Sequence, residues 1–418
     1  MFKRHLFFIS FLILSYSAHT QCNYTQPKFS ITVENDVVYG VQTGWHGRLD
    51  TLKIDIYKPV GDGNVKRPVV VMIHGGGFSG GNKRDLKLLG EKYASQGMVC
   101  ISVGYRLGFI RPLSFDYPYS LDPAEMLRAS YRGQQDAKAA IRFMKARSQQ
   151  DSTDRDQYYA VGFSAGGFIA LAIGYASDST FKPKECKGLA DGINLNGTFK
   201  RPDLGPIDGL LNQNGQSASI KGVFNFFGAV YDTSMIKAGG PKLFQYHQTG
   251  DPVVPCGYNR PYHGIGLGIP DNYPYVLGSC LIEKRLQNMG SNAPENITYI
   301  YTGNKHEVHD LQAYEKLMSQ QLTDWICASS SSIDTEINQK AHFYPNPVND
   351  FLLLDLNSNE LNAVIEIDIF NATMQKIETI TSTTGSFDMR KLPSGVYFIK
   401  VRDPSNQAFF RIVKSSTN

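Results

Sequence analysis

Two short glycine-rich stretches hold the residues best suited to do chemistry. "GFSAGG" spans residues 162–167 and places Ser164 between two glycines in the spacing G-x-S-x-G. "HGGGFSGGNK" spans residues 74–83 and contains five glycines. A serine hydroxyl can attack a carbonyl carbon, and backbone N–H groups left uncovered by glycines can stabilise the oxyanion that then forms. The two stretches together indicate acyl-transfer chemistry.

The surroundings of Ser164 favour a nucleophile over an ordinary structural turn, which is the alternative interpretation. A β-branched and aromatic run at 157–164 leads into the serine, and a helix of small residues follows it. A serine on a sharp strand-to-helix turn is lifted clear of the sheet. A Cβ at either neighbouring glycine, Gly162 or Gly166, would collide inside such a turn.

The glycine loop at 74–83 also matches two nucleotide-binding patterns by its letters. Residues 75–80 satisfy G-x-G-x-x-G, but that fingerprint needs an acid at the end of the next strand, and residues 100–106 contain none. Residues 76–81 have the glycine spacing of a phosphate-binding loop, but Asn82 stands where the lysine belongs. Both nucleotide interpretations therefore fail on context.

A third interpretation makes the same glycines half of an oxyanion hole. The loop follows the strand "PVVVMIH", where a hydrolase with a serine on such a turn places its first oxyanion donors. Consecutive glycines at 75–77 leave the backbone N–H groups open to an oxygen. The amide of Ala165, directly after the serine, completes the predicted pocket.

The serine needs an acid and a histidine as partners. In hydrolases whose serine lies on such a strand-to-helix turn, the acid and then the histidine follow the serine along the chain. "KLFQYHQTGDPVVP" at 242–255 is an apolar strand with Asp251 directly after a Thr-Gly turn, so we predict that Asp251 is the acid. A plain turn-forming aspartate is the alternative. Chain order leaves His263, His306 and His309 as candidate bases, and His306 is favoured because it lies on the loop just past the next strand.

The pattern of strands and helices predicts an α/β fold with a mostly parallel sheet flanked by helices. Apolar runs at 68–74, 98–106, 157–164, 222–230, 242–248 and 296–303 alternate with helical stretches such as 124–148. Two earlier segments, 31–40 and 49–59, alternate polar and apolar residues and predict antiparallel edge strands.

The chain divides into four predicted segments. Residues 1–21 have the basic start and short apolar run of a secretory signal peptide, a run too short to span a membrane. Residues 22–327 form the predicted catalytic domain, and the polar stretch 328–341 a linker. Residues 342–418 contain four strand-like runs and predict a small all-β antiparallel sandwich.

Composition and cysteine usage narrow the function further. The net charge of +4 is too weak to suggest nucleic acid or an anionic membrane as the main partner. The six cysteines match no zinc pattern, and the chemistry assigned above needs neither a metal nor a cofactor. In an exported protein we expect Cys256 and Cys280 to form a disulfide, and Cys100, inside an apolar strand, to be a buried free thiol.

With these motifs in order, residues 30–327 resemble the α/β-hydrolase superfamily. They look like its secreted esterase and lipase branch, which includes carboxylesterases and acetylxylan and feruloyl esterases. The resemblance implies that Ser164, Asp251 and His306 hydrolyse a carboxylic ester through an acyl-enzyme. It also implies oxyanion donors at Gly76 and Gly77 together with Ala165. One departure is "HQTGDP", where relatives more often show "HGTxD".

Residues 343–418 resemble the C-terminal sorting domain of type IX secretion cargo from Bacteroidetes. The resemblance rests on "FYPNPVND" (343–350) and "LPSGVYFIKV" (392–401). It implies that the type IX machinery exports the protein across the outer membrane, with release or surface attachment. A carbohydrate-binding or spacer sandwich is the alternative.

Two aromatic-rich segments, 107–123 and 256–275, leave the sheet at its predicted catalytic end. We expect Phe78, Tyr117 and Tyr258 to contact the substrate, and the other aromatic residues there to wall a cleft: Phe109, Phe115, Tyr119, Tyr262, Tyr273 and Tyr275. Loops packed by their own tyrosines are the alternative. Export favours an extracellular, polymeric or aryl ester. A serine peptidase and a catalytically silent binding module are the rival functions.

Overall fold

A computed structural model of the chain describes most of its residues. The described ranges are 22–61, 63, 66–109, 119–188, 191–194, 197–330, 341–344, 348–356, 365–371, 375–401 and 409–414. The predicted signal peptide, Phe115 and Tyr117 lie outside these ranges. No helix within them is long and apolar enough to cross a membrane.

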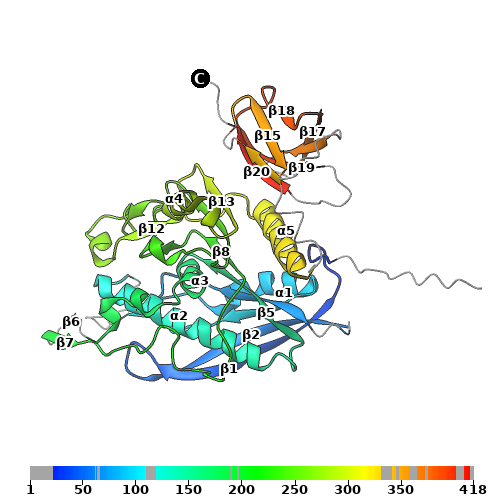
Figure 1. Cartoon of the computed structure of the whole chain (residues 1–418). Coiled ribbons are helices and arrows are strands. Elements are labelled where there is room, and N and C mark those ends of the chain that lie inside the picture. The colour runs from blue at the N-terminus through cyan, green and yellow to red at the C-terminus, as the bar shows by residue number, and fades with distance from the viewer. Residues whose placement is uncertain are drawn as a thin grey trace, which may run out of the picture.

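The larger part of the molecule is built on one large sheet with helices packed on it (Figure 1). The sheet has eight strands in the order β1-β2-β4-β3-β5-β8-β10-β13. Strands β1 and β2 pair antiparallel, as do β2 and β4, and the remaining pairs are parallel. This confirms the predicted α/β class and the antiparallel edge. The strands are β1 Ser30–Thr43, β2 Leu49–Val60, β3 Arg67–Ile73, β4 Val99–Val103, β5 Thr153–Phe163, β8 Gly222–Phe226, β10 Lys242–Gln248 and β13 Asn296–Tyr301.

Helices cover both faces of the sheet, which explains why its central strands are apolar on both sides. In β3, Val69 and Val71 face the core that holds α2, α3 and α4, while Val70 and Met72 face the core that holds α1 and α5. The helices are α1 Lys87–Ser95, α2 Pro123–Ala146, α3 Ala165–Tyr175, α4 Ser279–Met289 and α5 Leu311–Ser330. Short strands decorate the loops: β6 Asp191–Asn194, β7 Gly197–Lys200, β9 Ala229–Val230, β11 Tyr258–Asn259 and β12 Val276–Gly278.

The parallel strands end at one edge of the sheet, and the predicted site residues lie there. The glycine loop follows β3, the serine turn follows β5, the acid follows β10 and the histidine loop follows β13. Because β5, β8, β10 and β13 are successive neighbours, loops far apart in sequence leave the sheet side by side.

After α5 the chain forms two antiparallel sheets, with strand orders β14-β15-β18 and β17-β16-β19-β20. Side chains from both sheets share one core, in which Ile367 and Ile369 of β16 are fully buried, as their alternation with acidic residues predicts. The strands are β14 Ala341–Tyr344, β15 Phe351–Leu356, β16 Ile365–Phe370, β17 Lys376–Ser382, β18 Ser386–Asp388, β19 Gly395–Val401 and β20 Phe409–Lys414. Helix α5 extends to Ser330, three residues into the stretch 328–341 that the sequence predicts as a linker, and the domain bounds stay predictions.

Two disulfides stabilise the larger domain. Cys256–Cys280 confirms the predicted pair, and Cys100 is buried as a free thiol, also as predicted. Cys22–Cys327 joins residues 305 positions apart and was not predicted. It ties the segment before β1 to the last turns of α5, where Trp325 packs in the core.

We expect the double variant Cys22→Ser, Cys327→Ser to lower the free energy of unfolding by about 2–5 kcal/mol, because the crosslink restricts the unfolded chain. Both tryptophans of the chain, Trp45 and Trp325, lie in this domain, so tryptophan fluorescence during urea unfolding reports on it alone. A change below about 1 kcal/mol would contradict this role of the crosslink.

Candidate active site

Ser164 lies on a tight turn between the end of β5 and the start of α3. Its backbone has φ 54° and ψ −120°, and its N–H donates to the carbonyl of Phe226 at 2.9 Å. A non-glycine residue with positive φ costs of order 1–3 kcal/mol and persists only where the surroundings enforce it. The turn therefore holds the serine in a strained position that exposes its hydroxyl at the sheet edge.

Gly162 and Gly166 must be glycines because other backbone atoms lie very close to both positions. A Cβ on Gly162 would lie 2.0 Å from the carbonyl oxygen of Gly166. A Cβ on Gly166 would lie 2.1 Å from the carbonyl oxygen of Ile73 at the end of β3. A side chain at Gly162 would push the start of α3 away from β5, and a side chain at Gly166 would push it away from the end of β3.

The structure brings the predicted serine, histidine and acid together. His306 Nε2 lies 2.8 Å from Ser164 Oγ, and His306 Nδ1 lies 2.7 Å from Asp251 Oδ2. His309, the alternative base, lies instead against Tyr301 and Tyr246, with its Nδ1 3.1 Å from the Tyr246 hydroxyl. The geometry thus favours His306 over His309 as the partner of the serine.

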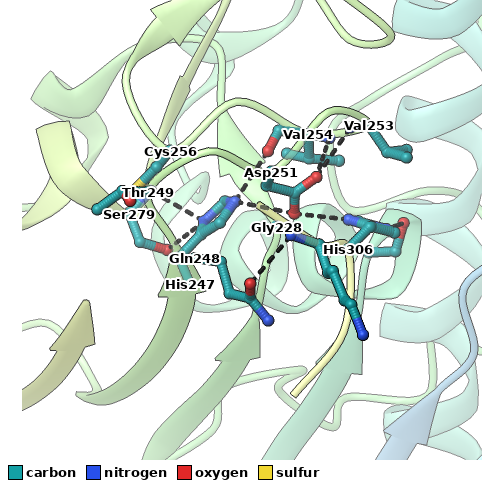
Figure 2. Close-up of polar contacts among 12 residues, drawn as sticks. Gly228, His247, Gln248, Thr249, Asp251, Val253, Val254, Cys256, Ser279 and His306 are labelled. Atoms are coloured by element: carbon teal, nitrogen blue, oxygen red, sulfur yellow. Dashed lines mark hydrogen bonds and ion pairs between the residues drawn. The ribbon is translucent and has the colours of Figure 1, made fainter. Parts of the chain in front are cut away.

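Asp251 is an ionised carboxylate in a buried position, with 1% of its surface exposed. Burial opposes its ionisation, but hydrogen bonds from His247 and His306 outweigh burial and lower its pKa to about 2. Its other oxygen, Oδ1, accepts the backbone N–H groups of Val253 at 2.8 Å and Val254 at 3.0 Å. Figure 2 shows the carboxylate between these two residues and the two histidines.

The ionised acid fixes the proton positions on His306. A carboxylate can only accept, so Nδ1 of His306 carries the hydrogen that points at Asp251. In the neutral ring Nε2 then has a free lone pair directed at the Ser164 hydroxyl. The ring also packs edge-on against Phe227, with centroids 4.6 Å apart. This arrangement suits removal of a proton from the serine.

The glycine loop at 75–81 lies directly beside the serine. A Cβ at Gly75 would come within 3.3 Å of the Ser164 Cβ. Gly76 and Gly77 have φ values of 106° and 59°, which favour glycine. Among the hydrogen bonds of the described residues, none uses the amides of Gly76, Gly77 or Ala165 as donors. These amides are therefore free to receive an oxyanion.

The start of this loop is held by His74, which is almost fully buried. Its Nδ1 lies 2.7 Å from the Gly75 carbonyl, and its ring stacks on Tyr105 with centroids 4.5 Å apart. The Tyr105 hydroxyl donates to the His74 carbonyl at 3.0 Å. Burial lowers the pKa of His74, so the ring is neutral and serves as a structural support.

The predicted substrate contacts occupy different environments. Phe78 is 2% exposed and packs edge-on against Phe168 in the core, so only its backbone is near the loop surface. Tyr258 is 62% exposed and stacks on Tyr275 with centroids 4.9 Å apart. Tyr117 lies outside the described residues. All three contacts stay predictions.

One of the aromatic residues expected to wall a cleft, Tyr262, lies against the glycine loop. A Cβ on Gly77 would lie 2.8 Å from the Tyr262 hydroxyl. Tyr262 contacts Tyr119 and Tyr273, whose ring centroids lie 5.1 Å and 4.9 Å from its own. Phe109, by contrast, is completely buried in the core and cannot line an open cleft.

Sequence reasoning missed two residues that support the site. His247 Nε2 lies 3.4 Å from Asp251 Oδ2, and chain order does not select His247 because it precedes the acid. Gln248 bonds to the backbone on both sides of His306. Their place in "HQTGD", just before the predicted acid, is the signal that could have identified them.

Two family models match the chain. Residues 54–258 match the model described as BD-FAE, and residues 342–415 match the model described as secretion system C-terminal sorting domain. The first match includes the glycine loop, Ser164 and Asp251 but ends before His306. The second indicates export to the cell surface or the medium, with the type IX secretion machinery as a partner.

Curated and solved relatives are also similar to parts of the chain. Gut esterase 1 of Caenorhabditis briggsae and that of Caenorhabditis elegans are 30% and 32% identical over 119 residues, 28% of this chain. The chain spans about a fifth of the length of these relatives (20% and 19%).

Solved structures match at lower identity over a longer stretch. Thermogutta terrifontis esterase 2 phosphoramylated by tabun has a TM-score of 0.45 at 17% identity, covering 72% of this chain and 95% of its own. A truncated carbohydrate esterase from gut microbiota has a TM-score of 0.43 at 16% identity, covering 72% and 98%.

The low pKa of Asp251 predicts a pH-dependent contribution to stability. A carboxyl whose pKa falls from 3.8 to about 2 on folding stabilises the folded state at any pH above 3.8. That contribution, about 2 kcal/mol, is lost as the pH falls through the folded pKa of about 2. Because asparagine does not titrate, Asp251→Asn lacks this contribution to stability.

We therefore expect the stability difference between the wild type and Asp251→Asn to shrink by about 2 kcal/mol between roughly pH 5 and pH 2. Urea unfolding followed by tryptophan fluorescence measures both proteins at each pH. Other carboxyls titrate equally in the two proteins and cancel. A pH-independent difference would contradict an ionised Asp251 in the folded state.

Proposed function

We propose that this chain, whose residues 54–258 are an esterase domain of the BD-FAE family and whose residues 342–415 are a C-terminal sorting domain, is an exported serine carboxylic-ester hydrolase. In this proposal Ser164 is the nucleophile, His306 the general base and Asp251 the acid that orients it. The supporting observation is the continuous hydrogen-bonded line from Ser164 Oγ through the His306 ring to Asp251, with distances of 2.8 Å and 2.7 Å.

The first half of the reaction forms an acyl-enzyme. Ser164 Oγ attacks the ester carbonyl carbon while His306 Nε2 takes the hydroxyl proton. The carbonyl oxygen becomes an oxyanion that accepts hydrogen bonds from the amides of Gly76 or Gly77 and Ala165. When the tetrahedral intermediate collapses, the bond to the alcohol oxygen breaks and the imidazolium returns its proton to that oxygen. Alcohol leaves, and the acyl group stays on Ser164.

The second half of the reaction releases the carboxylic acid product by the same steps, with water in place of the serine hydroxyl. His306 removes a proton from a water molecule, whose oxygen attacks the acyl carbon. The oxyanion forms again at the same amides, and its collapse breaks the bond to Ser164 Oγ. The proton held by His306 returns to the serine oxygen, so enzyme and charge are restored. Asp251 stays ionised throughout and stabilises each transient imidazolium.

Aromatic side chains near the glycine loop and an exported location favour an extracellular ester with an aryl or polymeric part. The hydroxyl of Tyr262 approaches Gly77, and the rings of Tyr119 and Tyr273 pack against Tyr262. Esterified plant polysaccharide fits both features. Parallel assays with acetylated xylan, feruloyl esters and a polyester film distinguish the acyl and alcohol classes, and cleavage of none of them would overturn the polymeric substrate.

We expect Ser164→Ala to lower kcat for p-nitrophenyl acetate by roughly 10⁴-fold or more, because it removes the only atom that bonds to the acyl group. Steady-state hydrolysis of the purified full-length chain measures this. Ser95→Ala, which removes a hydroxyl that donates to the Lys92 carbonyl of the same helix α1, is a matched control that should keep the wild-type rate. Full activity of Ser164→Ala would exclude a serine esterase at this site.

The two histidines on the loop after β13 give a second comparison. His306→Gln should lose roughly 10³-fold or more in kcat, because the serine then has no base. His309→Gln should change kcat less than about threefold, since His309 contacts Tyr246 and Tyr301 rather than the serine. The reverse order of effects would move the role of base to His309.

A further inference from the structure

We propose that His247 and Gln248, adjacent residues at the end of β10, are positioning residues, one for the acid and one for the base. The proposal rests on the proposed function of Ser164, His306 and Asp251 and deepens it. Successive side chains of a strand point to opposite faces. The last two residues of β10 can therefore support two different loops, the turn that carries Asp251 and the loop that carries His306.

His247 lies behind the acid and is fully buried. Its Nε2 lies 2.9 Å from the Val254 carbonyl oxygen and 3.4 Å from Asp251 Oδ2. Both oxygens can only accept, so Nε2 carries the hydrogen. Val254 in turn donates its N–H to Asp251 Oδ1. One imidazole therefore fixes the turn at 251–254 and adds a donor to the carboxylate oxygen that faces His306.

The opposite nitrogen of His247 is also held. Its Nδ1 lies 3.0 Å from the hydroxyl of Ser279, the first residue of α4, which therefore donates to it. The Ser279 oxygen accepts from the side-chain amide of Asn225 at 3.3 Å. Figure 2 shows His247 between Ser279 and Asp251. Because Ser279 fixes the tautomer, the Nε2 hydrogen stays directed at the acid turn.

The serine that fixes this tautomer is itself anchored by the neighbouring disulfide. Cys280 follows Ser279, is bonded to Cys256, and donates its N–H to the Cys256 carbonyl at 2.9 Å. Cys256 lies two residues after Val254, on the same segment that His247 supports. The Cys256–Cys280 disulfide therefore links the segment after the Asp251 turn to the start of α4, where Ser279 lies.

Gln248 supports the histidine loop from the same strand and is 2% exposed. Its Nε2 donates to the Glu307 carbonyl at 2.8 Å, and its Oε1 accepts the Lys305 N–H at 3.0 Å. These are the two residues that flank His306. One buried amide therefore holds the backbone on both sides of the base, at the position where this chain departs from "HGTxD".

The chain offers a matched control on the same strand. Gln245 is also buried in β10, and its amide donates to Thr298 of β13 at 2.9 Å, away from the acid and base loops. Gln245→Met and Gln248→Met remove the same buried amide from the same strand. A general loss of stability affects both variants, whereas a positioning role affects only Gln248→Met.

We expect Gln248→Met and His247→Phe each to lower kcat for p-nitrophenyl acetate roughly 10- to 100-fold with KM changed less than about threefold. Gln245→Met should stay within about twofold of the wild type. His247→Gln, which keeps a donor near the Nε2 position, should recover most of the kcat lost in His247→Phe. If His247→Phe does not fold, Ser279→Ala replaces it and should show the same kcat loss.

A second readout does not depend on activity. We expect the proton between His306 Nδ1 and Asp251 Oδ2, which are 2.7 Å apart, to give a far-downfield signal in the proton NMR spectrum. We expect this signal to shift or broaden in His247→Phe and Gln248→Met and to remain in Gln245→Met. An unchanged signal together with kcat values equal to that of Gln245→Met would overturn the proposal, and a higher KM at unchanged kcat would make these residues substrate contacts instead.

The two proposals fail in different ways. If the wild type and Ser164→Ala were equally inactive on esters, the proposed function would fail, and the NMR comparison would still decide whether His247 and Gln248 position the acid and the base. If the wild type were active and the variants kept its kcat and its NMR signal, only the positioning roles would fail.

Discussion

The buried, ionised carboxylate of Asp251 is the interaction on which the rest of the site depends. Burial of a carboxylate that is 1% exposed favours its protonated form, but hydrogen bonds from His247 and His306 outweigh burial and lower its pKa to about 2. Because it stays charged, His306 keeps its hydrogen on Nδ1 and presents Nε2 to Ser164. A neutral acid would leave the base free to adopt the wrong tautomer.

The parallel sheet brings these groups together without any of them being close in sequence. Ser164 follows β5, Asp251 follows β10 and His306 follows β13, and β5, β8, β10 and β13 are consecutive neighbours. The three residues therefore lie at the same edge of the sheet. The side chains of the last two residues of β10 hold the turn with Asp251 and the loop with His306. Strain at the serine turn persists because Gly162 and Gly166 let β3, β5 and α3 approach closely.

The sequence predicted the fold class, the eight strands of the large sheet and the residues that the structure brings together, because strand-to-helix turns and apolar runs have local signatures. It did not predict the hydrogen bonds of His247 and Ser279 that hold the Asp251 turn. His247 precedes the acid and so is no candidate base, and Ser279, 32 residues later, carries no local signal of its contact with His247. The Cys22–Cys327 pair, 305 residues apart, was likewise unpredictable, since six cysteines allow fifteen pairings. The sequence also does not show to which side of the glycine loop the Phe78 ring turns, and the structure buries that ring.

The central claim is that the strained turn carries an activated serine, and covalent labelling tests it most directly. A fluorophosphonate reacts with a serine whose proton a neighbouring base removes, and peptide mass spectrometry locates the adduct. We predict one adduct for each full-length chain, on the peptide that contains Ser164, and strongly slowed labelling of His306→Gln. The absence of any adduct, or an adduct on another residue, would contradict the assignment of Ser164 as the nucleophile.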